Sequence, residues 1–186
     1  YKYIGLHSRL ELTKKEKKYK ICFILTGPEP QRTSFEKIVM KSIKGRKEEI
    51  VIILGKTEDK KRVITENNLT IISSSNTKEI NKYILESELI ISRSGYSTIM
   101  DLQKLQSNAI FVPTPGQTEQ EYLAKYLKER EVCFYQKQKE FDLNKSIPES
   151  KKYSSFTSKT NKDNFGELFH FFENDWESRT NIFGWS

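Results

Sequence analysis

The chain has few cysteines and no long apolar run, and each absence excludes a class of protein. Cys22 and Cys133 are the two cysteines among 186 residues, and both lie inside apolar runs. A secreted scaffold framed by disulfides is therefore excluded, and buried thiols in a reducing cytosol are expected. No apolar run approaches the roughly 20 residues that a membrane-spanning helix needs, and no signal-peptide pattern opens the sequence.

Sequence patterns typical of nucleic-acid-binding proteins are also missing. The chain has a net charge of +7, which favours phosphate-rich partners, but it contains no helix-turn-helix, zinc-finger or RNP pattern. Residues 1–20 carry a net charge of +5, whereas the segment from Asp163 onward carries −4. This uneven distribution of charge predicts either peripheral contact of the leading segment with an anionic membrane or a solvated linker. No nucleic-acid partner is expected.

Five short apolar runs favour strands that are buried on both faces of a parallel sheet. They lie at 21–26, 50–54, 69–72, 89–91 and 109–112. Segments whose apolar residues have helical spacing separate or follow these runs. The alternation predicts an α/β protein with a Rossmann-like, doubly wound parallel sheet.

The flanking segments predict three parts. Residues 1–20 are expected to form an entry strand or linker, residues 21–162 the Rossmann-like domain, and residues 163–186 a C-terminal helix and tail. Within the domain, the polar stretch 137–162 is expected to be a loop or irregular insertion. The tail carries an apolar stripe that must be covered, either by this domain or by another domain or subunit. Its members are Phe165, Leu168, Phe169, Phe172 and Trp176.

Three strand-to-helix turns have unusual content, at the edge where open α/β sheets bind ligands on helix N-termini. The 26–32 turn contains Gly27, which permits close backbone approach, and Gln31. Its two prolines, Pro28 and Pro30, remove amide donors, so it is either a stiff connector or a poor phosphate cradle.

The 92–101 turn is the most informative. Amides near Gly95 could hold a phosphate, with the Ser97 and Thr98 hydroxyls as further donors. Asp101 follows one helical turn later, where its carboxylate could accept hydrogen bonds from a ribose diol. Thr98-x-x-Asp101 also has the spacing of a helix capping box, and both interpretations stay open.

The 113–121 turn ends its strand with Pro-x-Pro-Gly. Thr118-x-x-Glu121 again has capping-box spacing. Glu119 and Gln120 lie at the expected helix start, and their carboxylate and amide groups could bind sugar hydroxyls.

Together, these elements resemble glycosyltransferase family 28. Residues 90–102 (IISRSGYSTIMDL) resemble the family element R-(S/A)-G-x-x-T-x-x-E-(I/L), and residues 110–124 resemble its P-x-P…Q-x-x-N-A element. The order and spacing agree over roughly residues 20–130. The resemblance is to the C-terminal, donor-binding half of MurG-type enzymes of the two-domain GT-B fold, and it implies a UDP-sugar site.

The resemblance assigns roles by position. Asp101 takes the place of a ribose-binding Glu, and Gln120, with Glu119 beside it, falls where the family contacts the sugar hydroxyls. Asn76 and Thr77 occupy the segment whose backbone contacts uracil. The diphosphate would be held by Gly95, Tyr96, Ser97 and Thr98. The loop that faces the interdomain cleft would contain Gly27 and Gln31.

The sequence departs from the family pattern at several of these positions. Leu123 stands where the family has Asn, so one sugar hydrogen bond is lost and the identity of the sugar stays open. Asp101 is one methylene shorter than Glu. Pro28 and Pro30 replace a more glycine-rich turn.

The resemblance implies attack of an acceptor hydroxyl on the anomeric carbon, with UDP as the leaving group stabilised by helix amides and basic groups. No metal and no cofactor are expected, because no His, Cys and carboxylate cluster has ligand spacing, and UDP-sugar is itself the donor substrate. The family's catalytic base lies in the N-terminal domain. We therefore expect a fragment that binds the donor but is inactive alone, with Tyr3-Ile4-Gly5 resembling the interdomain linker.

The expected partners are UDP-sugar and an N-terminal acceptor domain, in the cytoplasm or at the inner membrane face. Cell-envelope polysaccharide is one open acceptor class. Three alternatives remain. The chain could be the donor subunit of a two-subunit GlcNAc transferase, half of a UDP-sugar hydrolase of related fold, or a non-catalytic nucleotide-binding module.

Overall fold

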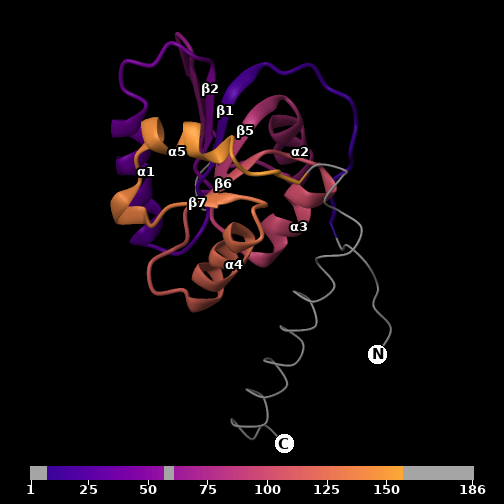
Figure 1. Ribbon diagram of the computed structural model, residues 1–186. Helices are drawn as coiled ribbons and strands as arrows, with labels where there is room; N and C mark the ends of the chain where they lie inside the picture. The colour runs from indigo at the N-terminus through magenta and orange to yellow at the C-terminus, as the bar shows by residue number, and fades with distance from the viewer. Residues whose placement is uncertain (1–7, 57–60, 157–186) are drawn as a thin grey trace, which may run out of the picture.

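The computed structural model describes residues 8–56 and 61–156, which form one sheet covered by helices on both faces (Figure 1). The strand order is β3-β4-β2-β1-β5-β6-β7. All neighbouring strands are parallel except β3 and β4. The strands are β1 (Tyr19–Ile24), β2 (Ile50–Ile53), β3 (Val63–Glu66), β4 (Leu69–Ile72), β5 (Ser87–Ser92), β6 (Ala109–Phe111) and β7 (Phe134–Tyr135). The predicted doubly wound α/β class is confirmed.

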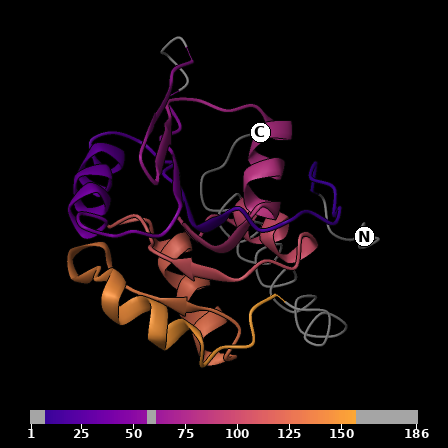
Figure 2. The same ribbon diagram turned by 90° about the horizontal axis from the view of Figure 1, so that it is seen from above.

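Helices cover both faces of the sheet. They are α1 (Gln31–Ser42), α2 (Thr77–Leu85), α3 (Tyr96–Lys104), α4 (Thr118–Glu129) and α5 (Leu143–Ser150), with a short 3-10 helix, η1 (Gln138–Glu140). Apolar residues of α1 and α5 join one core cluster, and those of α2, α3 and α4 join the other. Seen from above, the purple α1 and orange α5 lie on one side of the sheet and the magenta α2 on the other (Figure 2). In the described ranges no helix has the length and apolarity that crossing a bilayer requires.

The two core clusters explain why the strand sequences are unbroken apolar runs. In β1, Cys22 and Ile24 belong to one cluster, whereas Ile21 and Phe23 belong to the other. Because both faces of such a strand are buried, a polar residue at every second position would not stabilise it. Both cysteines are free and buried, as predicted. Burial raises the pKa of the Cys22 thiol to about 12, so this thiol stays neutral and unreactive near neutral pH.

Four elements were not predicted: β3, the two-residue strand β7, η1 and α5. The four residues of β3 are all exposed, so this edge strand has no apolar run, and Asn67 turns back to β4 with a φ of +51°. The expectation of a loop at 137–162 is wrong over η1 and α5. The short α5 carries Leu143 on the core and is capped by Asp142, whose Oδ1 accepts a hydrogen bond from the Asn144 N–H at 2.9 Å. Too few apolar residues repeat in it to give a helical period.

The described part of the leading segment, residues 8–18, forms neither helix nor strand, and β1 begins at Tyr19. Leu10 is nevertheless buried in the core. The Lys17 ammonium donates to the carbonyls of Leu85 (2.9 Å) and Ser87 (2.7 Å), and partial burial lowers the pKa of Lys17. The predicted linker Tyr3-Ile4-Gly5 and the predicted helix and tail at 163–186 lie outside the described residues.

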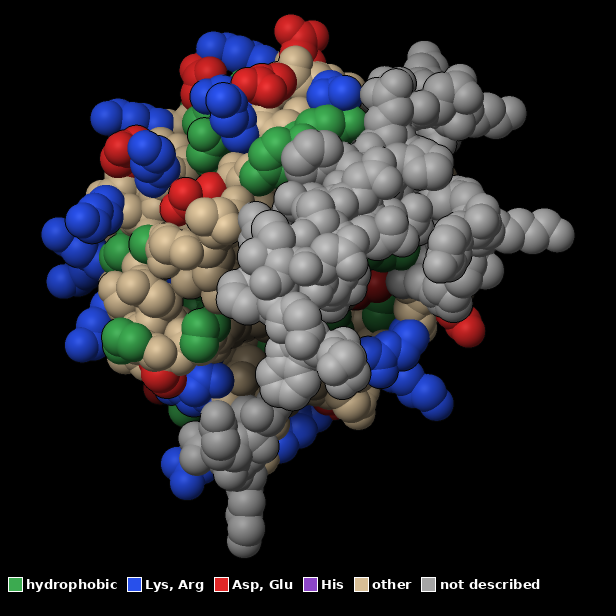
Figure 3. Space-filling model, turned by 90° about the horizontal axis from the view of Figure 1, so that it is seen from below, with side chains coloured by type: hydrophobic (Ala, Val, Ile, Leu, Met, Phe, Trp, Pro, Cys, Tyr) green, Lys and Arg blue, Asp and Glu red, His purple; other side chains and the backbone are tan. Residues whose placement is uncertain are grey.

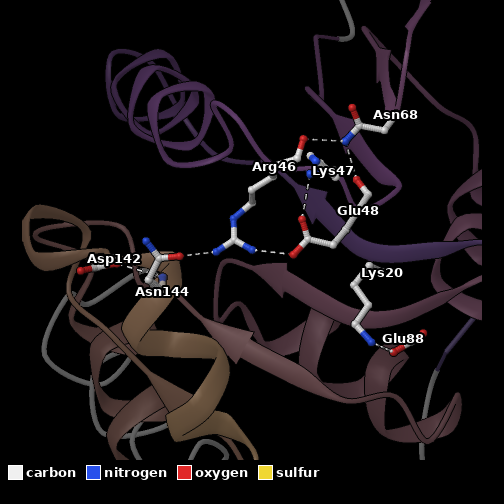
Figure 4. A network of polar contacts seen from close by, with 8 residues as sticks. All are labelled: Lys20, Arg46, Lys47, Glu48, Asn68, Glu88, Asp142 and Asn144. Atoms are coloured by element: carbon white, nitrogen blue, oxygen red, sulfur yellow. Dashed lines mark hydrogen bonds and ion pairs between the residues drawn. The ribbon is translucent and has the colours of Figure 1, made fainter.

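Polar contacts connect the segments at the edge of the sheet where the parallel strands begin (Figure 4). The Arg46 guanidinium donates to Glu48 Oε1 at 2.9 Å and to Asn144 Oδ1 at 2.5 Å. The Asn68 amide donates to the carbonyls of Arg46 (3.1 Å) and Glu48 (2.6 Å). The strand-to-helix turns therefore all lie at the opposite, carboxyl edge.

Candidate functional site

The three turns singled out in the sequence meet at the carboxyl edge, around the central strand β1. The chain passes from β1 to β2 on one side and then crosses through α2 to β5 on the other. A reversal of this kind is where open α/β sheets bind ligands. Gly27, with a φ of +122°, lies so close to the 113–121 turn that a Cβ there would be 3.7 Å from Thr114 Oγ1. The Ser94 hydroxyl donates to the Gln120 carbonyl at 2.7 Å, which joins the 92–101 and 113–121 turns.

The N-terminus of α3 differs from those of the other described helices because no carboxylate of the described residues caps it or lies in its first turn. Its N-cap is Gly95, which makes no side-chain cap, and its first turn contains no acid. By contrast, Glu29 accepts the Thr33 N–H of α1 at 3.1 Å. An acid lies in the first turn of α2 and of α4, and Asp142 caps α5. The positive dipole end of α3 therefore meets no capping side chain and no first-turn acid among the described residues, and it suits an anion.

The residues predicted to hold a diphosphate surround this N-terminus. Tyr96, Ser97 and Thr98 are the first three residues of α3; Ser97 is exposed, and the other two are half-buried. A Cβ on Gly95 would meet only Thr98 Oγ1, at 4.0 Å. A side chain at Gly95 would therefore have room among the described residues.

Asp101 does not cap its helix, so the capping-box interpretation of Thr98-x-x-Asp101 is wrong. The helix begins at Tyr96, which places Asp101 in its second turn. The Asp101 carboxylate instead accepts the Ser8 hydroxyl at Oδ1, at 2.5 Å, and the Lys104 ammonium donates to the Ser8 carbonyl at 3.1 Å. Among the described residues no group donates to Asp101 Oδ2, so this oxygen is available to a ligand.

The capping-box interpretation of Thr118-x-x-Glu121 is wrong as well, because the N-cap of α4 is Gln117. Gln120 is held by its neighbours: its Oε1 accepts the Thr114 N–H at 2.9 Å, and its Nε2 donates to Gln117 Oε1. Glu119 is exposed in the first turn of the same helix. Gln120 thus has a fixed orientation, and the described residues leave one of its amide hydrogens and one lone pair unused.

The capping box that the structure does contain is at Asn76, which the sequence assigned to the uracil segment. Asn76 Oδ1 accepts the Glu79 N–H at 3.0 Å, and Glu79 Oε2 accepts the Asn76 N–H at 3.1 Å. Thr77 is the exposed first residue of α2. Next to this cap, the Ser75 hydroxyl is buried and has no hydrogen-bond partner among the described residues.

Asn76→Ala is expected to lower the free energy of unfolding by about 1 kcal/mol, the usual cost of losing an N-cap side chain. Nucleotide affinity of the folded protein should stay unchanged, because the capping amide is already occupied by the backbone of Glu79. Chemical denaturation and a nucleotide titration on the same variant measure both quantities. A tenfold loss of affinity at unchanged stability would show that the Asn76 side chain contacts the base directly.

Arg93 is a component of the site that the sequence reasoning missed. It is 2% exposed, and its guanidinium lies 4.4 Å from the centre of the Phe35 ring. Its hydrogen-bond acceptors come from three separate segments: the carbonyls of Val112 (2.9 Å), Pro113 (3.1 Å) and Gln31 (3.2 Å), and Oε1 of Gln138 (2.6 Å). Burial lowers the pKa of Arg93 to about 10, so it remains charged at neutral pH. The signal in the sequence that could have pointed to Arg93 is its place directly after an apolar strand.

Gln138 joins Arg93 to the start of α1. It is 5% exposed, and its Nε2 donates to Gln31 Oε1 at 3.1 Å and to the Ser34 hydroxyl at 3.3 Å. Gln31 belongs to the loop predicted to face the cleft, and its side-chain oxygen accepts this hydrogen bond within the protein. Sequence reasoning could not find Gln138, because it lies in the stretch interpreted as a loop.

A hollow of about 510 Å³ opens beside the 113–121 turn, between that turn and the segment around η1. Aromatic rings and lysines dominate its lining, including Tyr122, Tyr135, Lys125 and Lys137. Within the described ranges, no group of three or more His, Cys, Asp or Glu residues is arranged to hold a metal ion. The carboxyl edge offers backbone amides, amide side chains and hydroxyls, together with the carboxylates of Asp101 and Glu119 and the lysines of the hollow.

A doubly wound sheet with an uncapped helix at its reversal point places the chain in the class of α/β domains that bind ligands at the carboxyl edge of the sheet. The sequence model described as the glycosyltransferase family 28 C-terminal domain matches residues 21–173, so the chain belongs to that family. The resemblance stated from the sequence is thereby confirmed. No curated protein sequence matches the chain.

Two solved structures are similar to this fold. MurG of Acinetobacter baumannii is 18% identical, with a TM-score of 0.54, and the match covers 75% of this chain and 44% of that one. The glycosyltransferase SnogD from Streptomyces nogalater is 11% identical, with a TM-score of 0.53, and the match covers 72% and 34%. At these identities the likeness shows the fold, which is that of one half of a GT-B enzyme. The match spans less than half the length of either structure.

Proposed function

We propose that this chain binds the UDP-sugar donor of a glycosyltransferase that transfers a hexosyl group to an acceptor hydroxyl. The observation that carries the proposal is the uncapped, acid-free N-terminus of α3 at the reversal point of the sheet. Family membership supplies the reaction class. The helix amides suit a diphosphate, which is the part shared by all UDP-sugars.

The remaining candidate residues lie in positions that suit the rest of the donor. Asp101 is one helical turn beyond the amides, with Oδ2 available for a ribose hydroxyl. Gln120 is held beside the same turn and can offer both a donor and an acceptor to a sugar hydroxyl. The segment that contains Asn76 follows β4, where its backbone could contact the base.

In the proposed mechanism, this half of the enzyme stabilises the leaving group. When the bond from the anomeric carbon to the diphosphate breaks, negative charge develops on the departing UDP. Fixed N–H dipoles that already point at the diphosphate stabilise this charge without reorganising. The base that activates the acceptor is assigned to an N-terminal acceptor domain or a separate acceptor subunit, so we expect the chain alone to bind donor but not transfer sugar.

Peripheral contact with an anionic membrane and a cytoplasmic location stay predictions. On the face seen in Figure 3, Lys and Arg side chains are spread along the margin with acidic side chains among them. A mixed surface of this kind gives weaker attraction to anionic lipid than one continuous basic patch.

Titration of the isotope-labelled chain with UDP, UDP-GlcNAc, UDP-glucose, UDP-galactose and thymidine diphosphate tests the proposal. We expect UDP to shift the amide resonances of residues 95–98 and 101 in two-dimensional NMR spectra. The sugar whose UDP conjugate binds more tightly than UDP itself would identify the donor. Absence of any shift at millimolar UDP would contradict the proposal.

Gln120→Met should remove the extra affinity that the sugar adds to UDP, because it deletes the amide proposed to hydrogen-bond the sugar. The expected loss is about 1 kcal/mol, the net value of one hydrogen bond. Calorimetric titration with UDP and with the best-binding UDP-sugar measures the difference. UDP serves as the internal control, since its affinity should not change. An unchanged sugar increment would remove Gln120 from the site.

A further inference from the structure

Arg93 is a buried cation to which the described residues offer no anionic partner. All its acceptors are neutral: three backbone carbonyls and the side-chain oxygen of Gln138. Within 8–56 and 61–156, no carboxylate forms an ion pair with it. Burying a charge is costly unless it is paired, and a carbonyl neutralises a cation only in part. Within the described residues, the interior therefore holds a positive charge that no carboxylate compensates.

This charge lies under the carboxyl edge, at the place where the proposed ligand is most negative. Arg93 directly precedes Ser94 and the Gly95 cap of α3, and its guanidinium reaches the start of α1 and the end of β6. The side chain is 98% covered, and both terminal nitrogens are already bonded, so it cannot swing out to touch a ligand. Its field can still reach the edge, because few water dipoles intervene to screen it.

We propose that Arg93 is a positioning residue whose buried charge is the counter-charge of the donor's diphosphate. It acts without contact, by holding the 26–32 and 113–121 turns against α3 and by making the potential at the α3 amides more positive. This inference rests on the proposed function, because it requires a diphosphate at that helix. It adds a residue that the turn motifs do not place in contact with any part of the ligand.

A ligand series that differs in charge separates this role from a merely structural one. The affinities of uridine, UMP and UDP are measured by calorimetry for the wild-type chain, Arg93→Gln and Arg93→Lys. Both variants lose the planar guanidinium group with its forked donors, but only Arg93→Lys keeps the positive charge. For Arg93→Gln we expect the affinity to fall about 100-fold for UDP, about 10-fold for UMP and less than about 3-fold for uridine. The loss should grow with the negative charge of the ligand, because the variant removes a nearby positive charge. Arg93→Lys should recover most of the UDP loss.

Arg46→Met is the matched control, because it removes one positive charge at the opposite edge of the sheet (Figure 4). It should change all three affinities by less than about 2-fold, since Arg46 lies at the far edge of the sheet and Glu48 already neutralises its charge. Should Arg93→Gln fail to fold, Arg93→Met provides a second neutral variant with no amide to bury.

The possible outcomes are distinguishable. Equal losses for uridine, UMP and UDP would mean that Arg93 only holds the fold, and would overturn the inference. So would an Arg93→Lys variant that binds UDP as weakly as Arg93→Gln. If the wild-type chain itself fails to bind UDP, the proposed function fails first and the inference falls with it. If the wild type binds UDP but the losses are not graded with charge, only the inference fails.

Discussion

Gly95→Asp is expected to make the chain more stable while abolishing its binding of UDP. Gly95 is the N-cap of α3, with φ −71° and ψ 147°, a conformation that any residue adopts. A Cβ there meets only Thr98 Oγ1 at 4.0 Å, so the aspartate fits. Its carboxylate would cap the helix and complement the dipole, together worth about 0.5–1 kcal/mol.

The same carboxylate would occupy the proposed place of the diphosphate. Two like charges about 4 Å apart repel by about 4 kcal/mol at the effective dielectric of a protein surface, which corresponds to several hundredfold in affinity. Thermal unfolding and a UDP titration on one sample give the two opposite changes. Gly95→Asn is the control, because it caps without charge and should weaken UDP far less. Unchanged UDP affinity in Gly95→Asp would mean that the α3 amides do not hold the diphosphate.

The elements that could be predicted are those whose pattern follows from burial on both faces. The five unbroken apolar runs all became parallel strands, because a residue such as Cys22 or Ile91 can satisfy its backbone in the sheet and its side chain in either core cluster. Elements at the edge of the fold lack this signal. The exposed strand β3 is specified by its turn at Asn67, and α5 by its cap at Asp142.

The sequence predicted which turns form the site better than it predicted which hydrogen bonds their residues make. Spacing rules placed capping boxes at Thr98 and Thr118, whereas the structure caps α2 through Asn76 and leaves α3 uncapped. A capping motif is ambiguous until the first helical residue is known, and one residue of error changes the assignment. Arg93 was overlooked because the importance of a buried cation depends on which distant carbonyls surround it.

Asp101→Ala is expected to weaken UDP binding by about 1–3 kcal/mol, the value of a hydrogen bond to a charged group. Since Asp101 does not cap α3, loss of a helix cap cannot explain such a change. The variant should also bind UDP and 2′-deoxy-UDP with similar affinity if the carboxylate holds the ribose 2′-hydroxyl. Titration of both nucleotides into the wild type and the variant measures this discrimination.

Ser8→Ala is the control for Asp101→Ala, because Ser8 donates to Asp101 Oδ1 and both variants lose that hydrogen bond. Each should lower the free energy of unfolding by about 1 kcal/mol, the typical net value of one hydrogen bond. Only Asp101→Ala removes the oxygens that a ribose would use, so Ser8→Ala should keep UDP affinity and the preference for UDP over 2′-deoxy-UDP. If Ser8→Ala loses that preference as fully as Asp101→Ala does, the role of Asp101 is to anchor the leading segment. The nucleoside must then be held elsewhere on the carboxyl edge.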